Sequence, residues 1–308
     1  MRVAFFGTPE FAVPSLRALV GEGFDVVAVV TQPDAAQGRS RSHVLPPSVK
    51  AAALAEDLEV FQPTKPTDGA FLQRLRELEP DVGVVVAYGH ILKPELLAVP
   101  ARGMVNVHPS LLPELRGAAP VEWAIINGLE KTGVTIMQLD AGMDTGPILH
   151  QIPHHPDPDV TGGDLSAHLA EMGAQALVET LALLEQGGLS AVPQDESRAT
   201  YAPKLTREVA RIDWTKDAVT VARLVRGLDP RPGAWAQLDG AEVKLFSARV
   251  AEGRGQAGAV LTADGRLLIA AGGGGAVDVE EVQPAGKERM TADAWLRGAR
   301  LAPGRRFT

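Results

Sequence analysis

The sequence contains no cysteine among its 308 residues. A disulfide framework, a thiolate metal site and a cysteine nucleophile are therefore all excluded. The opening residues, MRVAFFGTPEF, hold one arginine and an apolar run too short for a secretory signal, and no later run is long enough to span a membrane. We expect a cytoplasmic protein without a membrane partner.

The chain also lacks an excess of positive charge. Lysine and arginine number 30 against 38 aspartate and glutamate residues, a net charge of -8 that argues against a general nucleic-acid coat. Residues 1–204 carry 14 basic and 25 acidic side chains, a net of −11, whereas residues 205–308 carry 16 and 13, a net of +3. Two interpretations stay open: catalysis in the acidic part with polyanion contact in the basic part, or ordinary scatter between domains.

The length of 308 residues and the hydrophobic content of 45% suggest two globular domains. Segments typical of strands and helices alternate in the first part of the chain. This order predicts an α/β domain over residues 1–186 with a doubly wound, parallel, Rossmann-like sheet. Such sheets bind ligands beyond the carboxyl ends of their strands. We expect strands at 2–6, 26–30, 82–86, 104–107 and 134–139, and helices at 11–20, 48–56, 70–79 and 163–185.

The pattern changes after residues 187–204, which are polar, rich in turn-forming residues and predicted to be an inter-domain linker. One helix is expected at 217–228. Several short strands with tight turns then predict a small OB-like β-barrel domain over residues 205–308. The strands expected there are 234–238, 243–248, 258–261, 267–270 and 277–282.

The most informative stretch is NVHPSLLP, from Asn106 to Pro113, at the end of a predicted strand. Asn106 and His108 are two residues apart, so their side chains point to the same side. They could present an amide and an imidazole to one atom, as a developing oxyanion requires, or could instead satisfy loop backbone. A later loop between glycines adds Asp144, a carboxylate able to orient imidazole or relay a proton, although Asx-turns often have this sequence.

Together, NVHPSLLP and the DTG sequence at 144–146 resemble the catalytic signature of the 10-formyltetrahydrofolate-dependent formyltransferases. The resemblance runs from near residue 1 to beyond residue 287, and the full set of blocks fits the tRNA-modifying branch of that family best. The further blocks are FFGTPEF at 5–11, TQPD at 31–34, RGAAP at 116–120, GVTIMQLD at 133–140, YAPKL at 201–205, ARIDW at 210–214 and QPAGK at 283–287.

The resemblance implies formyl transfer from the co-substrate 10-formyltetrahydrofolate to the amino group of methionine on initiator tRNA, without a metal, by a monomer. Asn106 and His108 would hydrogen-bond the formyl oxygen, and Asp144 would help to remove the proton of the attacking amine. A neutral amine attacking an activated N-formyl group needs no covalent enzyme intermediate. The folate-binding residues implied are Ser110, Leu111, Leu112 and Pro113, with Tyr88, Ile91 and Leu92 in the pterin pocket, although the last three could simply be core.

The segment 35–55 follows a strand and holds basic residues but no acidic one. The resemblance implies an inserted loop that enters the tRNA acceptor stem, with Arg39, Arg41 and Lys50 as the tRNA-binding residues. Without the resemblance, a solvated flexible loop would be the simpler interpretation.

Other patterns are weaker. GRGQAG at 253–258 matches G-x-G-x-x-G but precedes a strand rather than a helix, so a dinucleotide role fails. The histidines and aspartates of residues 150–159 fit no recognised metal spacing, and we expect a solvated loop there. A Ser110–His108–Asp144 triad lacks the G-x-S-x-G elbow.

Three alternative functions remain to be weighed. A folate-dependent enzyme acting on an amino sugar nucleotide would differ in its acceptor. A catalytically silent RNA-binding protein would fail to bind folate. A nicotinamide oxidoreductase is disfavoured because Phe6–Pro9 lacks the glycine fingerprint after the first strand.

Overall fold

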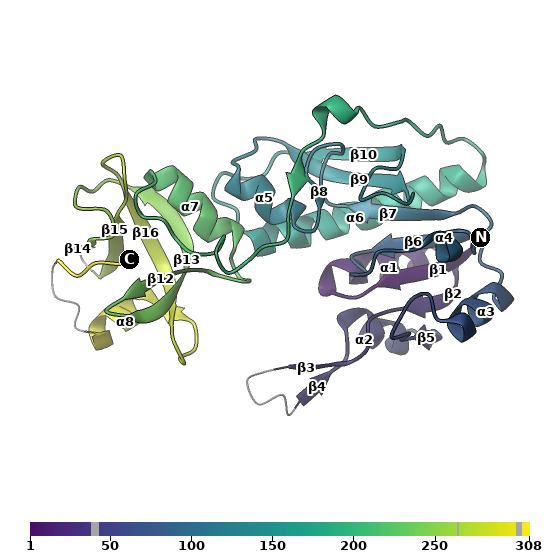
Figure 1. The fold of residues 1–308 in the computed structure, drawn as a ribbon, viewed down its shortest axis with the longest axis horizontal. Coiled ribbons are helices and arrows are strands. Elements are labelled where there is room, and N and C mark those ends of the chain that lie inside the picture. The colour runs from purple at the N-terminus through teal and green to yellow at the C-terminus, as the bar shows by residue number, and fades with distance from the viewer. Residues whose placement is uncertain (38–42, 264, 300–303) are drawn as a thin grey trace. The chain divides into compact units, whose positions relative to one another are not determined.

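The computed structural model describes residues 1–37, 43–263, 265–299 and 304–308, which form two compact units (Figure 1). Each unit is assembled from separate stretches of the chain. The first comprises Met1–Gly117, Lys131–His155 and Ser166–Tyr201, and the second comprises Ala118–Glu130, Pro156–Leu165 and Ala202–Thr308. No helix within these described ranges is long and apolar enough to cross a membrane.

A seven-stranded sheet forms the centre of the first unit, in the order β10-β9-β7-β6-β1-β2-β5 (Figure 1). The five strands from β7 to β5 are parallel, which confirms the parallel-dominated α/β fold. Two further strands extend the sheet in antiparallel orientation, because β9 pairs with β7, and β10 pairs with β9. The strands are β1 (Arg2–Gly7), β2 (Asp25–Val30), β5 (Val60–Phe61), β6 (Val82–Val86), β7 (Met104–His108), β9 (Thr132–Gln138) and β10 (Ile148–His154).

Helices cover both faces of this sheet. Helix α3 (Gly69–Glu77) shares a buried apolar cluster with strand residues such as Phe6 and Val85, and the carboxylate of Asp68 caps its first turn. Helix α6 (Gly162–Glu185) lies against the opposite face, since a Cβ added at its Gly173 would contact the side chain of Val107. This unit also contains α1 (Val13–Gly21), preceded by the short η1 (Glu10–Ala12), and the helices α2 (Ser48–Ala55) and α4 (Pro94–Leu97).

The segment 35–55 contains two strands and a helix among its described residues. Strands β3 (Ala35–Gln37) and β4 (His43–Leu45) form an antiparallel hairpin, and α2 follows it. Cross-strand backbone hydrogen bonds let a short segment project from the sheet while its polar groups stay paired. Helix α2 confirms the helix expected over residues 48–56, and the described part of the expected projecting loop is a hairpin.

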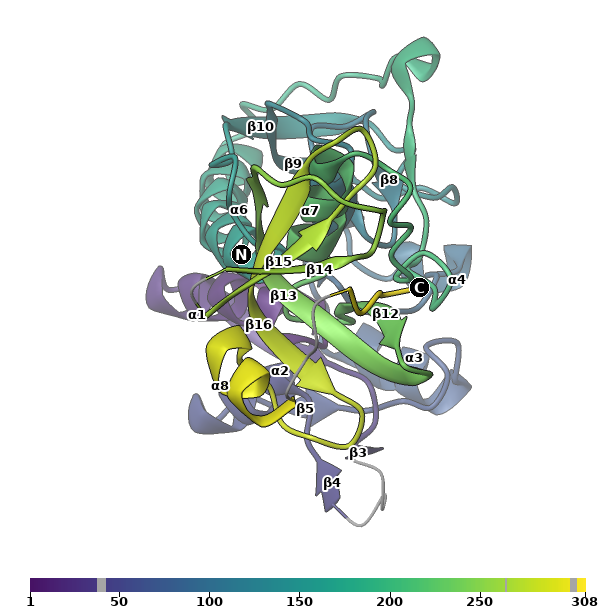
Figure 2. The ribbon, with the colours of Figure 1, turned by 90° about the vertical axis from the view of Figure 1, so that its left-hand side faces the viewer.

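The second unit contains an antiparallel sheet in the order β12-β13-β16-β15-β14, with β17 paired to β16 (Figure 2). Phe307 is bridged to Leu238 on one edge strand, and Arg306 to Ala259 beside the other. This half-barrel-like arrangement confirms the expected class of small β-domain. The strands are β12 (Ala234–Leu238), β13 (Ala241–Ala251), β14 (Val260–Ala263), β15 (Arg266–Ala270), β16 (Ala276–Pro284) and β17 (Met290–Thr291).

Helix α7 (Ala218–Gly227) closes the core of the second unit, because its Val221 and Val225 are buried with residues of the sheet. Asp217 accepts a hydrogen bond from the Thr220 amide at 2.9 Å and so fixes the start of the helix. The unit also contains α5 (Pro120–Ile126) and α8 (Ala292–Ala299).

Short strands β8 (Arg116–Gly117) and β11 (Tyr201–Ala202) form a separate two-stranded sheet, and η2 (Glu196–Arg198) precedes β11.

The solvated loop expected over residues 150–159 is wrong for its first half, because residues up to His154 belong to β10. The ring of His154 lies 4.4 Å from that of His168 on α6, measured between ring centroids. Burial, followed by the charges of His168 and His155, lowers the pKa of His154. Protonation of His154 is therefore less favourable in the folded chain than in the unfolded one.

This difference predicts an acid-sensitive stability. Below the ordinary histidine pKa of 6.5 the unfolded chain binds more protons than the folded one, so stability falls as the pH drops through that value. We expect the unfolding midpoint in denaturant to depend less on pH between about 7 and 5 in His154→Gln than in the parent chain. Parallel pH profiles for the two proteins would contradict this assignment.

Candidate active site

Strand β7 presents Asn106 and His108 on one face at its carboxyl end, as their spacing predicted. The His108 ring is buried, and its Nε2 lies 3.0 Å from the carbonyl oxygen of Leu115. Because a carbonyl only accepts hydrogen bonds, Nε2 is the donor and Nδ1 remains for other partners. The Asn106 side chain is partly buried and makes no hydrogen bond to any residue that the structure describes. An amide and an imidazole nitrogen are thus both available here.

The loop after β9 brings Asp144 to the same place. Its Oδ2 lies 3.8 Å from Nδ1 of His108 and accepts a hydrogen bond from the Gly117 amide at 2.8 Å. The first distance is too long for a direct hydrogen bond and leaves the imidazole nitrogen open to a reacting group. Asp144 has φ +56°, in the left-handed region, which is less favourable for a residue with a side chain, although aspartate adopts it more often than most residues.

The turn within this loop is made by Asp140 rather than by Asp144. The Asp140 carboxylate accepts hydrogen bonds from the Gly142 amide at 2.9 Å and the Thr145 hydroxyl at 2.8 Å. A Cβ at Gly146 would overlap the carbonyl oxygen of Gln138, so glycine is required where the loop rejoins the sheet. The Asp144 carboxylate takes no part in these turn hydrogen bonds and accepts from Gly117 instead.

Hydrogen bonds hold the segment expected to line the folate site in place. Ser110 donates its hydroxyl proton to the Glu114 carbonyl at 2.6 Å, and the Leu112 amide donates to the Thr135 hydroxyl at 3.0 Å. Ser110, Leu112 and Pro113 are buried, and Leu111 is partly buried. The path of this segment is therefore fixed within the first unit.

The three residues expected around the pterin are in different environments. Tyr88 is in the core with 1% of its surface exposed, its hydroxyl has no hydrogen-bond partner in the described structure, and burial raises its pKa to about 12. Leu92 is also in the core, whereas Ile91 is 87% exposed. The structure thus brings Tyr88 and Leu92 together and leaves Ile91 on the surface.

Of the residues expected to bind tRNA, Arg39 and Arg41 lie outside the described residues. The Nζ of Lys50 lies 2.8 and 2.7 Å from the two carboxylate oxygens of Asp34. This hydrogen bond is the largest cause that lowers the pKa of Asp34. The charge of Lys50 is therefore already paired within the first unit.

The residues that lie behind Asp144 were not predicted from the sequence. Arg116, with 1% of its surface exposed, donates hydrogen bonds to Oε1 of Gln194 and to both carboxylate oxygens of Glu196. Gln194 in turn donates to the carbonyl oxygens of Asp144 and Gly146 at 2.8 and 2.7 Å. The RGAAP block contained Arg116, but nothing marked Gln194 or Glu196 within a polar stretch predicted to be a linker.

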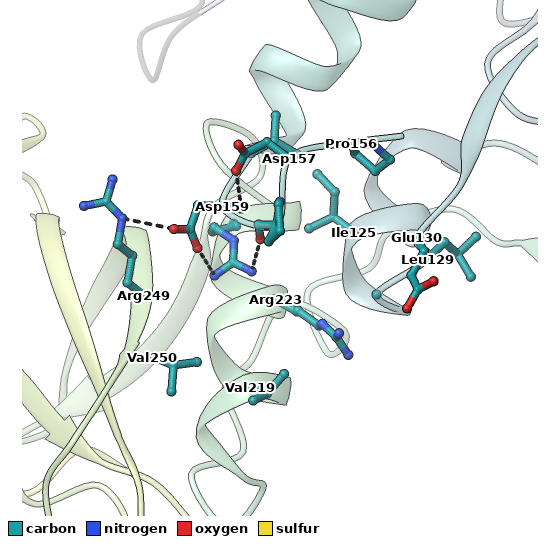
Figure 3. Close-up of a pocket in the computed structure, with 14 residues that line it drawn as sticks. Ile125, Leu129, Glu130, Pro156, Asp157, Asp159, Val219, Arg223, Arg249 and Val250 are labelled. Carbon is teal, nitrogen blue, oxygen red and sulfur yellow. Dashed lines mark hydrogen bonds and ion pairs between the residues drawn. The ribbon is translucent and has the colours of Figure 1, made fainter. Parts of the chain in front are cut away.

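The second unit contains a separate cavity of about 600 Å³ (Figure 3). Its buried Arg226 donates to the carbonyl oxygens of Ala248 and Pro158, and Asp159 lies within ion-pair distance of both Arg226 and Arg249. The lining holds three arginines and three acidic side chains, so its charges balance and give no preference for a polyanion. No cluster of three or more potential metal ligands is found among the residues for which coordinates are described.

Comparison with known proteins identifies the family. Residues 1–181 match the formyl transferase family, and residues 204–300 match its C-terminal domain. The chain is 45% identical to methionyl-tRNA formyltransferase of Geotalea uraniireducens, covering 99% of this chain and 97% of that protein, and 42% identical to the enzyme of the same name from Agathobacter rectalis, covering all of both.

More distant proteins share the fold. The structure of WlaRD, a sugar 3N-formyl transferase, is 18% identical with a TM-score of 0.69, covering 94% of this chain and 99% of that one. HypX from Aquifex aeolicus, solved in complex with tetrahydrofolic acid, is 22% identical with a TM-score of 0.67, covering 96% of this chain and 47% of that one. Two family matches and relatives similar along the whole length show that this chain belongs to the formyl transferase family.

Proposed function

We propose that this formyltransferase moves the formyl group of 10-formyltetrahydrofolate to the α-amino group of methionyl initiator tRNA, giving N-formylmethionyl-tRNA for translation initiation. The observation that carries the chemistry is the meeting of Asn106, His108 and Asp144 at the end of β7. The acceptor is supported by the whole-length relatives named methionyl-tRNA formyltransferase, whereas the sugar enzyme is only 18% identical.

Two tasks fall to the protein in this reaction. The amine nitrogen bonds to the formyl carbon, the bond from that carbon to N10 of the folate breaks, and one proton passes from the amine to N10. The formyl oxygen carries negative charge in the tetrahedral intermediate, and hydrogen-bond donors placed for that charge lower the barrier. The amine must also lose its proton, for which a nearby carboxylate is suited.

Asn106 and His108 serve the first task. The side-chain amide of Asn106 has no competing partner in the described chain and is free to donate to the formyl oxygen. The Nε2–H of His108 is occupied by the Leu115 carbonyl, so Nδ1 faces the reaction. A proton on Nδ1 makes it the second donor, and Asp144 at 3.8 Å stabilises the resulting positive charge.

Asp144 serves the second task. One of its oxygens, Oδ2, is held by the Gly117 amide, which leaves further lone pairs to accept the amine proton directly or through a water. Its side chain is 17% exposed, so the carboxylate is accessible while largely enclosed. A carboxylate with fixed orientation removes the proton without leaving its own position.

Substrate binding extends this proposal to the residues around the site. Ser110 to Pro113, with Tyr88, Ile91 and Leu92, border the folate, and Arg39, Arg41 and Lys50 contact tRNA phosphates, Lys50 by exchanging its Asp34 partner. Residues 1–186 act as the catalytic domain, 187–204 as the connection and 205–308 as the tRNA-binding domain. The net +3 of the last part supports its contact with a polyanion.

A comparison of acceptors tests this function. With 10-formyltetrahydrofolate as donor, we expect rapid formylation of charged initiator methionyl-tRNA, much slower formylation of charged elongator methionyl-tRNA, and none of a dTDP-linked amino sugar. The readout is the N-formylmethionine released from the tRNA. Preferential formylation of the amino sugar would overturn the proposed acceptor while leaving the chemistry intact.

Substitutions test the three catalytic residues. We expect Asn106→Ala to lower kcat by about 10²- to 10³-fold through loss of an oxyanion donor. His108→Ala and Asp144→Ala should each lower kcat by about 10²- to 10⁴-fold, because proton handling is also impaired. Circular dichroism should stay unchanged, and Asn127→Ala, at an exposed position after α5, serves as the control. Turnover near that of the parent in all three variants would refute the assignment.

A further inference from the structure

We propose that Gln194 is a positioning residue that sets the backbone of the Asp144 loop for formyl transfer, with Arg116 and Glu196 fixing Gln194 in turn. This inference rests on the proposed role of Asp144. It assigns a part in the reaction to the segment 187–204, whose composition indicated only a linker.

The Asp144 loop needs an external support. Asp144 has φ +56°, a conformation that is unfavourable for a residue with a side chain. Gln194 donates one hydrogen bond to the Asp144 carbonyl at 2.8 Å and a second to the Gly146 carbonyl at 2.7 Å. The two bonds span the residue between them and therefore fix the direction of the peptide groups on both sides.

The orientation of the Gln194 amide is determined by its partners. Two nitrogens of Arg116, which can only donate, lie 3.0 and 2.7 Å from one end of the amide. Two carbonyl oxygens, which can only accept, lie at the other end. Only one assignment satisfies all four contacts: the amide oxygen faces Arg116 and the amide nitrogen faces the loop.

Arg116 is itself immobilised. It is almost fully buried, and it pairs with both carboxylate oxygens of Glu196 at 2.9 and 2.7 Å, the fork geometry that suits guanidinium. The Glu196 carboxylate raises the pKa of Arg116, so the guanidinium remains charged. Glu196 is the exposed end of this chain of contacts, with 68% of its side chain accessible.

Two routes from neighbouring residues therefore converge on Asp144. The side chain of Arg116 holds the Asp144 backbone through Gln194, and the amide of Gly117 holds the Asp144 carboxylate directly. Thr200 holds the chain just before Gly117. Its hydroxyl accepts a hydrogen bond from the Leu115 amide at 2.8 Å, and its carbonyl oxygen accepts one from the Arg116 amide at 2.9 Å. Through Gln194 and Thr200, the segment 187–204 therefore contacts both the Asp144 loop and the loop after β7.

Gln194→Met in the full-length chain tests this positioning role, with Gln175→Met on α6 as the matched control. Gln175 has an exposed side chain bonded only to Glu179 in the described structure. We expect Gln194→Met to lower kcat about 10- to 100-fold, because small displacements of a catalytic group are costly. KM for both substrates should stay within about twofold, because the side-chain amide of Gln194 is already bonded to Arg116 and to the Asp144 loop. Amide hydrogen exchange at Gly117 should accelerate in this variant and not in the control.

Gln194→Glu provides a second variant in case Gln194→Met folds poorly. It keeps an acceptor for Arg116 but removes both donors to the loop, so we expect the same loss of kcat. In an Asp144→Ala background, either substitution should change kcat by less than about twofold, because residues that act through one another are not additive.

Several results would overturn the inference. Turnover and Gly117 exchange like those of the parent in both folded variants would show that Gln194 does not position Asp144. Equal losses with and without Asp144 would show a general structural role instead. If the parent chain itself fails to formylate methionyl-tRNA, the proposed function fails, while Gly117 exchange still decides whether Gln194 holds the loop.

Discussion

The hydrogen bond from the Gly117 amide to the Asp144 carboxylate, at 2.8 Å, joins the two loops from which the site is built. One loop follows β7 and the other follows β9. The two residues that the hydrogen bond joins are 27 positions apart in the sequence. The antiparallel pairing of β7 with β9 would by itself place the Asp144 loop near the start of β7. The left-handed turn at Asp144 and its bond to Gly117 are what direct the carboxylate toward His108.

A buried charge, the guanidinium of Arg116, lies beside that bond in the sequence and contacts the residue that holds the Asp144 backbone. Removing a guanidinium from water is costly, and the cost is offset only when its donors are paired. Arg116 meets this condition through Gln194 and Glu196, both from the segment that precedes β11. Truncating Glu196 would leave the charged, buried Arg116 without its carboxylate partner. Glu196, although exposed, therefore also supports the site.

The features that could be predicted are those that depend on residues close together in the sequence. Buried β-branched runs identified β6 to the residue, and the two-residue period placed Asn106 and His108 on one face. The antiparallel edge strand β10 was missed, because ILHQIPH contains proline and polar residues and does not alternate. Gln194 was missed for a different reason. Its partners lie 50 and 78 residues away, and no local pattern records such a contact.

The chemistry explains why these long-range contacts matter. An activated formyl donor and an amine nucleophile need no reactive enzyme side chain, so an amide, an imidazole and a carboxylate suffice. Such groups accelerate a reaction only when they are held in the geometry of the transition state. Catalysis in this chain, which has no cysteine, then depends on how firmly the catalytic side chains are held rather than on their intrinsic reactivity. The residues that hold them must be other than the catalytic residues themselves. Residues 194–200 provide them, so the polar composition of a connecting segment is no measure of its mobility.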